Sequence, residues 1–390
     1  MFIKRNLKDS LINYATKFPV VAVIGPRQAG KTTLTKKTFP NHTYFSLENP
    51  DTLDIIRLDP RDFLEKDYGS AGIILDEFQN EPQLLSYIQG IVDNNRRPGY
   101  FILTGSHNFL MNQAISQSLA GRVALLTLLP LSLQELKQSN QLTQNIDEAV
   151  FQGGYPDIFA RHLHPTEFYP QYTKTYVERD IRQLINVGSL TDFQRFMRLC
   201  AGRIGQLLNI SSLADDCNVS VPTIKSWLSI LEASYIVFLL QPHFNNYSKR
   251  LIKSPKLYFY DTGLACWLLK ITSTEQLNSH YLRGGLVESM IISEFYKGFY
   301  NQAQEPSVYF WRDSHGREID CLLDYGTDLI PIEIKSGKTI QKSFFDGLHY
   351  WCELANIDPS QGYVIYAGTE SHKRSVGSTI SWQDAGTIIR

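Results

Sequence analysis

Residues 25–32 constrain the fold of this chain more than any other segment. They read Gly25-Pro26-Arg27-Gln28-Ala29-Gly30-Lys31-Thr32, which matches the pattern G-x-x-x-x-G-K-S/T of phosphate-binding loops. Apolar residues 20–24 precede the loop and are typical of a buried strand, and a run of helix formers follows it. Glycines let such a loop fold with its N–H groups aimed at phosphate oxygens, and the next helix adds its positive end. The sequence therefore predicts an α/β nucleotide-binding domain built on a parallel sheet.

The same segment predicts which residues hold ATP and Mg²⁺. Lys31 is expected to reach the β- and γ-phosphates, and Thr32 to bind the metal ion. The expected nucleotide-binding residues are Gly25, Pro26, Arg27, Gln28, Ala29, Gly30, Lys31, Thr32 and Thr33. A second apolar run, residues 72–75, ends in Asp76 and Glu77. Ligands bind at the carboxyl ends of parallel strands, so Asp76 is expected in the Mg²⁺ shell and Glu77 is expected to polarise water. Together these residues predict ATP hydrolysis.

Three further polar residues are candidates for assisting hydrolysis. A third apolar run, residues 100–103, leads into Thr104 and Ser106, which could sense the γ-phosphate or could simply form a turn. Arg122 could stabilise charge in the transition state, within the chain or on a neighbouring subunit, and such an arginine raises turnover by about 10³–10⁵-fold. A surface arginine that caps a turn explains Arg122 equally well. Action between subunits would require a homo-oligomer.

Composition limits the location and the partners of the chain. Its 390 residues are enough for two or three domains, and a net charge of −1 means that any contact with nucleic acid must come from a local patch. The five cysteines are scattered, which favours reduced thiols over disulfides or a zinc site. The first residues lack the apolar stretch of a signal peptide, and the apolar run 235–240 is too short to cross a bilayer. We therefore expect a cytoplasmic protein without a membrane partner.

The middle of the chain has a helical pattern. Residues 141–190 are expected to form a helical connector, and residues 191–270 a winged-helix segment. Within the latter, Ser220 is a helix-capping residue ahead of a helix whose apolar positions repeat at helical spacing. The basic residues that follow this helix could contact DNA phosphates: Lys249, Arg250, Lys253 and Lys256. Alternatively, the segment only packs neighbouring domains together.

A second set of charged residues lies near the C-terminus. Residues 331–337 read as a strand with Glu333 and Lys335 on one face, and residues 317–323 read as a strand carrying Asp320. An earlier helical run carries Glu288. We expect Glu288, Asp320 and Glu333 to bind one or two Mg²⁺ ions, and Lys335 to orient hydroxide and stabilise the transition state. Glu318 could bind metal equally well, and the simplest alternative is a hairpin with a salt-bridged polar face.

These motifs carry a resemblance that covers nearly the whole chain. The chain resembles bacterial and archaeal AAA+-like P-loop ATPases that have a C-terminal domain of unknown function. The resemblance rests on the phosphate loop and on residues 74–77, 103–106, 119–122, 176–180, 253–259, 261–265 and 333–335. It implies an ATPase core, a winged helix and a nuclease-like terminal domain. The order helix-Glu, strand, strand-Asp, strand-Glu-x-Lys is similar to that of PD-(D/E)xK nucleases, which have a restriction-endonuclease-like fold.

We therefore expect an α/β chain of four parts. These are an AAA+-like ATPase domain, a helical connector, a winged-helix segment and a nuclease-like domain, covering residues 1–140, 141–190, 191–270 and 271–390. The leading hypothesis is Mg²⁺-dependent ATP hydrolysis coupled to a DNA-directed, nuclease-like domain. The alternative is a nucleotide-gated switch that binds DNA or protein through a catalytically inactive nuclease-like domain.

Overall fold

Five parallel strands form the sheet of the N-terminal domain, in the order β2-β3-β4-β1-β5. The computed structural model describes residues 2–66, 68–69, 71–106, 118–177, 190–243, 253–374 and 376–390. The strands are β1 (Val20–Gly25), β2 (Thr43–Ser46), β3 (Ile73–Asp76), β4 (Phe101–Ser106) and β5 (Val123–Thr127). The strand expected at residues 100–103 therefore continues to Ser106, so Thr104 and Ser106 lie in the strand and not in a turn after it.

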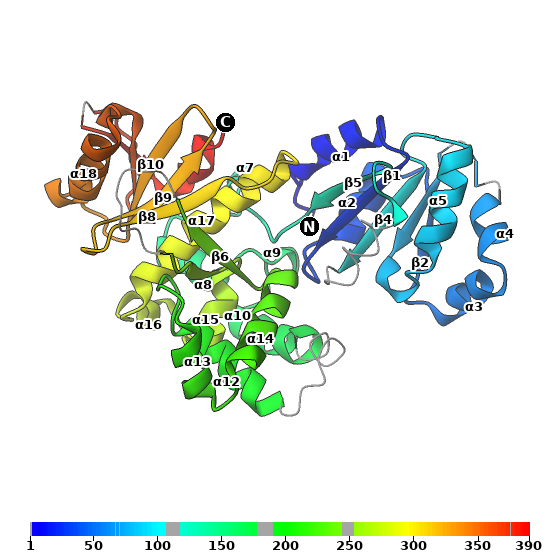
Figure 1. Cartoon of the computed structure of the whole chain (residues 1–390), viewed down its shortest axis with the longest axis horizontal. Coiled ribbons are helices and arrows are strands. Elements are labelled where there is room, and N and C mark those ends of the chain that lie inside the picture. Colours follow the sequence, from blue (N-terminus) through cyan, green and yellow to red (C-terminus); the bar gives the residue numbers. More distant parts are fainter. Residues whose placement is uncertain are drawn as a thin grey trace.

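Helices cover both faces of this sheet, which is why its strands read as continuous apolar runs. Along β1, Val20, Ala22 and Ile24 pack on one face, and Val21 and Val23 pack on the other. The first face is covered by α3 (Pro50–Leu58), α4 (Pro60–Glu65) and α5 (Leu84–Asn94). The second is covered by α1 (Leu7–Ala15) and α2 (Lys31–Thr38). Figure 1 shows this domain in blue and cyan on one side of the molecule.

The stretch between β5 and β6, called the middle segment below, is helical in its described part, and the sequence predicts helices in it from residue 141 onward. Its helices are α7 (Leu133–Gln138), α8 (Ile146–Gln152), α9 (Pro156–Ala160), α10 (Pro165–Tyr172), a π-helical turn (Thr173–Val177), α12 (Leu190–Ala201), α13 (Ile210–Cys217) and α14 (Val221–Ala233). Helices α13 and α14 form the expected helix–turn–helix, in which Asn218 takes a left-handed conformation and the Ser220 side chain accepts from Thr223 N. Helix α13 begins at Ile210, because Asn209 is its cap.

A seven-stranded sheet forms the second body, in the order β12-β11-β10-β9-β8-β6-β7. Its strands are β6 (Val237–Pro242), β7 (Lys256–Phe259), β8 (Val308–Arg312), β9 (Glu318–Asp324), β10 (Leu329–Lys335), β11 (Tyr363–Tyr366) and β12 (Ser378–Ser381). The boundary expected at residue 270 does not separate two bodies, because β6 pairs with β8 in parallel. One apolar core runs from the middle segment to the C-terminus, so the middle segment belongs to the second body.

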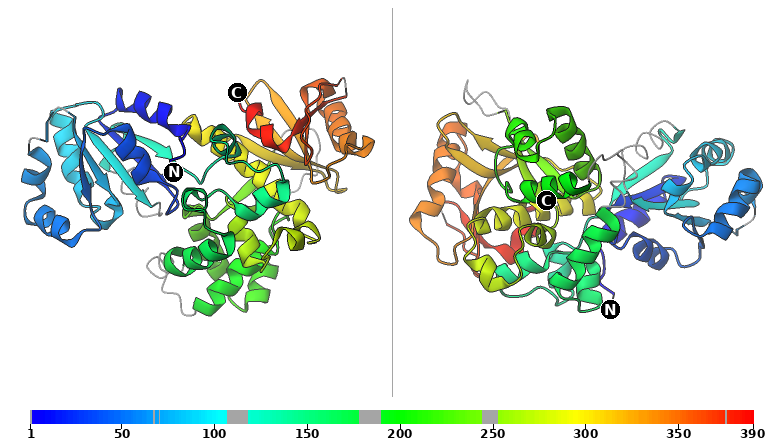
Figure 2. Two further views of the ribbon diagram at one scale, coloured as in Figure 1. Left: turned by 180° about the vertical axis from the view of Figure 1, so that it is seen from behind. Right: turned by 90° about the horizontal axis from the view of Figure 1, so that it is seen from below.

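The helices of this second body are α15 (Thr262–Leu268), α16 (Thr274–Asn278), α17 (Arg283–Asn301) and α18 (Asp346–Ala355). The predicted order of a helix and three strands is present: α17 is followed by β8, β9 and β10, which pair antiparallel. Helix α18 and the parallel strand β11 come next. Figure 2 shows α17 passing between the C-terminal sheet and the N-terminal domain, and Ser10 Oγ of α1 donates to Asn301 O at 3.0 Å.

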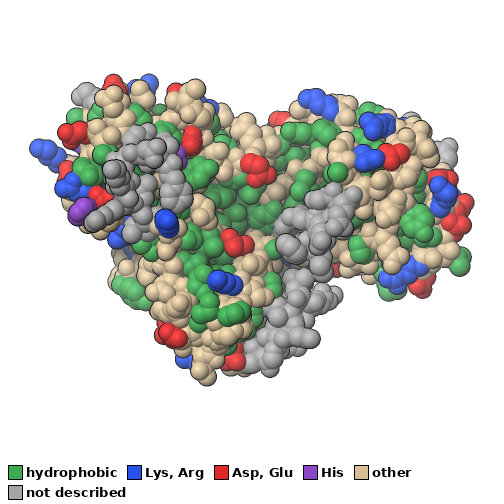
Figure 3. Space-filling view, viewed as in Figure 1, with side chains coloured by type: hydrophobic (Ala, Val, Ile, Leu, Met, Phe, Trp, Pro, Cys, Tyr) green, Lys and Arg blue, Asp and Glu red, His purple; other side chains and the backbone are tan. Residues whose placement is uncertain are grey.

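The cysteines, the apolar helices and the basic residues after α14 each bear on an expectation from the sequence. All five cysteines are buried and free of disulfides. Across the described residues, no helix is both long and apolar enough to cross a membrane. Lys249 and Arg250 lie outside the described residues, so their predicted contact with DNA has no structural account. Figure 3 shows a hollow between the two bodies on one face of the molecule.

Candidate functional site

The phosphate loop joins β1 to α2, and at Gly25 its backbone leaves no room for any side chain. Gly25 has a φ of +149°, and an added Cβ would lie 2.1 Å from Leu128 O. Gln28 and Gly30 also have positive φ values, of 59° and 93°. The loop therefore turns tightly against the end of β5, as its glycine pattern predicts.

Lys31, Thr32 and Asp76 come together at the carboxyl edge of the sheet. The Lys31 ammonium is buried and donates to Gly25 O at 3.1 Å and to Pro26 O at 2.8 Å. Thr32 Oγ1 donates to both Asp76 carboxylate oxygens at 3.0 Å. Thr104 also donates to Asp76, and Tyr44 OH donates to it at 2.7 Å. A hydroxyl and a carboxylate are the oxygen ligands that Mg²⁺ prefers, so this pair fits the metal ion that accompanies ATP.

Glu77 lies one residue beyond β3 in a left-handed conformation, with a φ of 54°. Its carboxylate accepts from Gln79 Nε2 and lies 3.4 Å from Ser106 N. Gln79 Nε2 also donates to Ser106 Oγ at 3.0 Å. Gln79 thus connects the predicted water-polarising residue with the predicted phosphate sensor. The sequence offers one signal for this residue, which is its position two residues after Glu77.

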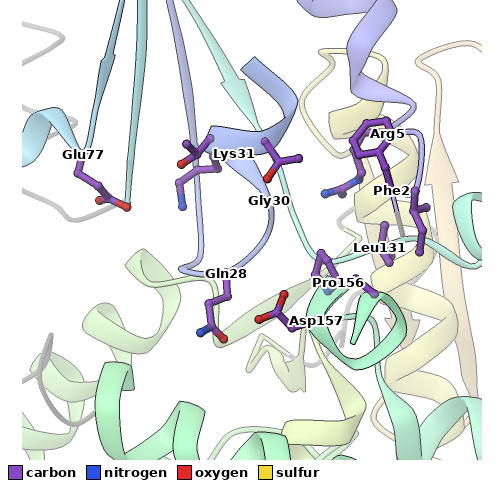
Figure 4. A pocket seen from close by; sticks show the side chains of 13 residues that line it. Phe2, Arg5, Gln28, Gly30, Lys31, Glu77, Leu131, Pro156 and Asp157 are labelled. Atoms are coloured by element: carbon purple, nitrogen blue, oxygen red, sulfur yellow. The ribbon is translucent and has the colours of Figure 1, made fainter. Parts of the chain in front are cut away.

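A cavity of about 300 Å³ opens beside the loop, and three parts of the chain line it. The N-terminal domain contributes Lys31, Thr32, Thr33 and Glu77, the first residues contribute Phe2, Ile3 and Arg5, and α9 contributes Pro156, Asp157 and Ala160. Figure 4 shows Asp157 reaching toward the loop from α9, on the side of the cavity opposite Arg5 and Phe2. The cavity beside the expected nucleotide site is therefore completed by α9, and no sequence pattern pointed to this helix.

Arg122 does not lie at this cavity. It directly precedes β5 at the amino edge of the sheet, where Val20 N donates to Arg122 O, whereas the loop follows the carboxyl end of β1. Its guanidinium pairs with the Asp93 carboxylate at 2.6 and 2.9 Å. The position excludes a role within the same chain, and action on a neighbouring subunit stays a prediction. Arg27 lies in the loop itself and approaches Glu48 at 3.5 Å.

Buried charges connect the loop to the second body. Arg5 is 4% exposed and donates to Ala29 O of the loop at 2.6 Å, to Leu129 O at 2.6 Å and to Glu135 at 3.0 Å. Glu135 closes a capping box at the start of α7. Glu294 of α17 accepts from the first two N–H groups of α7, at 2.7 and 3.1 Å. Lys297 of α17 donates to Leu131 O at 3.1 Å.

Helix α17 also carries one member of the C-terminal carboxylate cluster, defined here as Glu288, Glu318, Asp320 and Glu333. One carboxylate oxygen from each of Glu288, Glu318 and Asp320 lies within 4.8 Å of the others. Lys256 of β7 lies among them, with its ammonium 3.1 Å from Glu288 and in contact with Glu318. Lys256 is therefore a buried ion-pair partner, not the exposed DNA contact that the sequence suggested.

The second half of the cluster lies on β9 and β10. Asp320 accepts from Ile334 N at 2.7 Å, and Lys335 contacts Glu333 and lies 3.7 Å from Asp320. The structure thus brings together Glu288, Asp320, Glu333 and Lys335 with Glu318, the alternative ligand that the sequence offered, and it adds Lys256. The donor set consists of carboxylate oxygens, which suits Mg²⁺. Lys256, however, already supplies a positive charge to the two acids nearest to it.

Burial raises the pKa of two acids in the cluster, Glu333 and Glu288. It raises the pKa of Glu333 to about 9, with the nearby Asp320 charge adding to the shift. Burial likewise raises the pKa of Glu288 to about 7, although Lys256 opposes this shift. Additional positive charge in the cluster would therefore stabilise the ionised forms.

In metal-free solution, the Glu288→Gln variant is expected to become relatively more stable as pH rises. A carboxyl group with a pKa raised from 4.5 to about 7 on folding stabilises the fold below about pH 4.5 and loses that contribution as pH rises toward 7. Thermal unfolding in EDTA should therefore give similar Tm values for variant and wild type near pH 5, and a higher Tm for the variant near pH 8. A difference that is the same at both pH values would contradict this assignment.

Comparisons with known proteins match three stretches of the chain. Residues 17–137 match the AAA domain family, and residues 143–275 and 283–383 match two domains of unknown function, DUF8612 and DUF4143. An uncharacterized protein of Mycobacterium tuberculosis and one of Mycobacterium bovis are each 32% identical to this chain over 381 residues, covering 95% of it and 81% of their own length. The chain belongs to the family of these two proteins. Its N-terminal part is an AAA domain of the P-loop ATPase type.

Among solved structures, the Walker-type ATPase of Pyrococcus abyssi is similar at 14% identity, with a TM-score of 0.47 over 68% of this chain and 96% of that one. None of these matches describes the chemistry of the family's C-terminal half.

Proposed function

We propose that this protein is a Mg²⁺-dependent ATPase whose nucleotide state controls the C-terminal carboxylate cluster. The observation that carries the proposal is the unbroken set of contacts from the phosphate loop through Arg5, α7 and α17 to Glu288. A cavity completed by α9 supports it, because a nucleotide in that cavity would contact both bodies at once.

In this proposal, the chain's own residues position ATP for hydrolysis. The ammonium of Lys31 exchanges its loop carbonyl partners for β- and γ-phosphate oxygens, and the loop N–H groups bind the same phosphates. Thr32 and Asp76 would hold Mg²⁺, which would neutralise charge on the phosphates. Glu77 orients the attacking water and Ser106 contacts the γ-phosphate, while Gln79 keeps these two side chains in register.

A change in the loop on ATP binding is transmitted to the second body through α7. Movement of the loop at Ala29 displaces Arg5, and Arg5 shares Glu135 with the capping box of α7. The start of α7 is bound to Glu294, six residues along α17 from Glu288. Because the side chains of this route are buried and charged, they cannot shift independently at low cost.

The C-terminal half is proposed to act on nucleic acid. Glu288, Asp320 and Glu333, with Glu318, would hold Mg²⁺, which would activate a hydroxide for attack on a phosphodiester. Lys335 lies beside Glu333 and Asp320, where its charge stabilises the transition state. The helix–turn–helix of α13 and α14 is proposed as part of a winged helix. The exposed Lys253, which follows it in the sequence, would contact DNA. A cytoplasmic location and a homo-oligomer with Arg122 acting between subunits belong to the same proposal.

One observation favours a second candidate function. Lys256 pairs with both Glu288 and Glu318, so an internal cation already contacts two of the four acids in the cluster. In a nucleotide-gated switch, the C-terminal half would bind DNA or protein without cutting it. The two candidates differ in whether Lys256 leaves the cluster when ATP binds.

A cleavage assay separates the two candidates. Wild type is incubated with single-stranded DNA, duplex DNA and RNA in Mg²⁺ or Mn²⁺, with and without ATP. Cleavage that Asp320→Ala/Glu333→Ala abolishes and that Glu353→Ala on the exposed face of α18 retains would establish the nuclease. Intact ATP turnover without cleavage of any polymer would favour the switch. If turnover is also absent, the ATPase proposal fails.

A further prediction concerns the lysine in the cluster. Removing its charge is expected to tighten the binding of a divalent cation, because Lys256 and a metal ion would compete for Glu288 and Glu318. Calorimetric titration with Mn²⁺ should give at least about tenfold tighter binding for Lys256→Met than for wild type, since losing one competing charge contributes more than about 1.4 kcal/mol. Unchanged or weaker Mn²⁺ binding by a folded variant would show that Lys256 does not compete with metal.

A further inference from the structure

A second large cavity lies in the helical middle segment, apart from the nucleotide cavity and the carboxylate cluster. It has a volume of about 420 Å³ and is formed by α10, the π-helical turn, α12 and the end of α15. These helices lie together in the lower part of Figure 1. The cavity shares no lining residue with the nucleotide cavity.

Three cationic side chains from three elements surround this cavity. Lys174 comes from the π-helical turn, Arg198 from α12, and Lys270 follows α15. All three are exposed, and none forms an ion pair with any residue of the described ranges. The described lining contains no aspartate or glutamate. In a chain with a net charge of −1, three cations at one cavity without an ion-pair partner among the described residues favour an anionic ligand.

The rest of the lining suits a flat apolar group. Trp267 is half-buried, Met197 and Leu268 are buried, and Pro170 completes this apolar wall. Gln194 adds an amide. A tryptophan beside several cations matches a nucleotide unit, because the base stacks on the ring and the phosphates meet the charges. A free anion such as phosphate would leave the apolar wall unused.

We propose that this cavity binds a nucleotide unit, free or as part of a single-stranded nucleic acid. Lys174, Arg198 and Lys270 meet phosphate oxygens, and the base lies against Trp267. The inference deepens the proposed function by giving its nucleic-acid partner a binding site, but it requires neither ATP hydrolysis nor cleavage.

The test measures binding in a protein whose phosphate loop is disabled. Fluorescence anisotropy of a labelled oligothymidylate is followed in EDTA with the Lys31→Ala chain, so that neither the first site nor cleavage contributes. Three phosphate contacts on a single strand predict a slope of about −2 for log K against log salt concentration. Arg198→Ala and Lys270→Ala should each reduce that slope by about 0.7. The matched control is Arg195→Ala, since Arg195 is also exposed on α12 but does not line the cavity.

Trp267 provides a test that does not depend on charge. Trp267→Ala should weaken binding by about 5- to 150-fold, whereas Trp267→Phe keeps a stacking ring and most of the affinity. Complete competition by AMP would identify a free nucleotide as the source of the ligand, and its failure to compete would identify the strand. The proposal is overturned if the folded protein shows no saturable binding of either probe, or if Arg195→Ala weakens binding as much as Arg198→Ala does.

Discussion

Replacing Lys31 with alanine is expected to lower ATP turnover by about 10²–10³-fold, the loss typical of removing one charge-stabilising donor. Lys31 lines the cavity that ATP would enter, and its buried ammonium donates to the carbonyls of Gly25 and Pro26. Alanine removes the positive charge that would stabilise the negative charge developing on the phosphates. It leaves the sheet unchanged. Phosphate release from purified protein at saturating ATP and Mg²⁺ measures the effect.

Two further variants show whether the loss is specific. Lys17→Ala removes an exposed lysine at the amino edge of the sheet and should keep wild-type turnover. Glu77→Gln should reduce turnover while ATP binding persists, because Glu77 acts on water and does not hold the nucleotide. Turnover by Lys31→Ala equal to that of wild type would refute hydrolysis at this loop.

Replacing Glu135 with alanine is expected to lower the free energy of unfolding by about 3–5 kcal/mol, as when one partner of a buried ion pair is removed. Glu135 is fully buried, and its carboxylate accepts from Arg5 at 3.0 Å, from Asn6 N at 2.7 Å and from Ser132 N at 2.9 Å. Without it, the Arg5 guanidinium stays buried with only carbonyl partners. Urea denaturation followed by circular dichroism measures the change in the first unfolding transition.

A neighbouring ion pair on α7 is the matched control. Lys137 pairs with Asp384, but both side chains are exposed, at 50% and 36%. Lys137→Ala should therefore change the free energy of unfolding by no more than about 1 kcal/mol. If Glu135→Ala proves equally mild, Arg5 and Glu135 do not tie the phosphate loop to α7, and the proposed route loses its first step.

The nucleotide site could be predicted from the sequence because its residues belong to short local patterns. The loop, Asp76 and Glu77 each follow a buried strand, and parallel strands bring their carboxyl ends to one edge. Arg5 and Asp157 could not be predicted in this way. They reach the cavity from segments whose positions depend on the packing of two bodies, and no local pattern records that packing.

The C-terminal cluster shows the same limit. Asp320 and Glu333 lie on adjacent antiparallel strands, so alternation placed them correctly. Lys256 looked like one of several exposed basic residues after the helix–turn–helix, because its sequence neighbours are basic. The pairing of β6 with β8 brings β7 into the C-terminal sheet and buries Lys256 among the acids. No sequence pattern marked Glu135 either, which lies in the short polar helix α7.

Hydrogen–deuterium exchange tests the central claim, that ATP at the loop acts on the carboxylate cluster through α7 and α17. Glu77→Gln protein would be compared with and without ATP and Mg²⁺, and the Lys31→Ala variant would serve as the control. We predict that ATP changes protection in three regions at once: the loop, the start of α7 and residues 283–301 of α17. A change confined to the loop and the ends of β3 and β4, with α17 unaffected, would contradict the coupling.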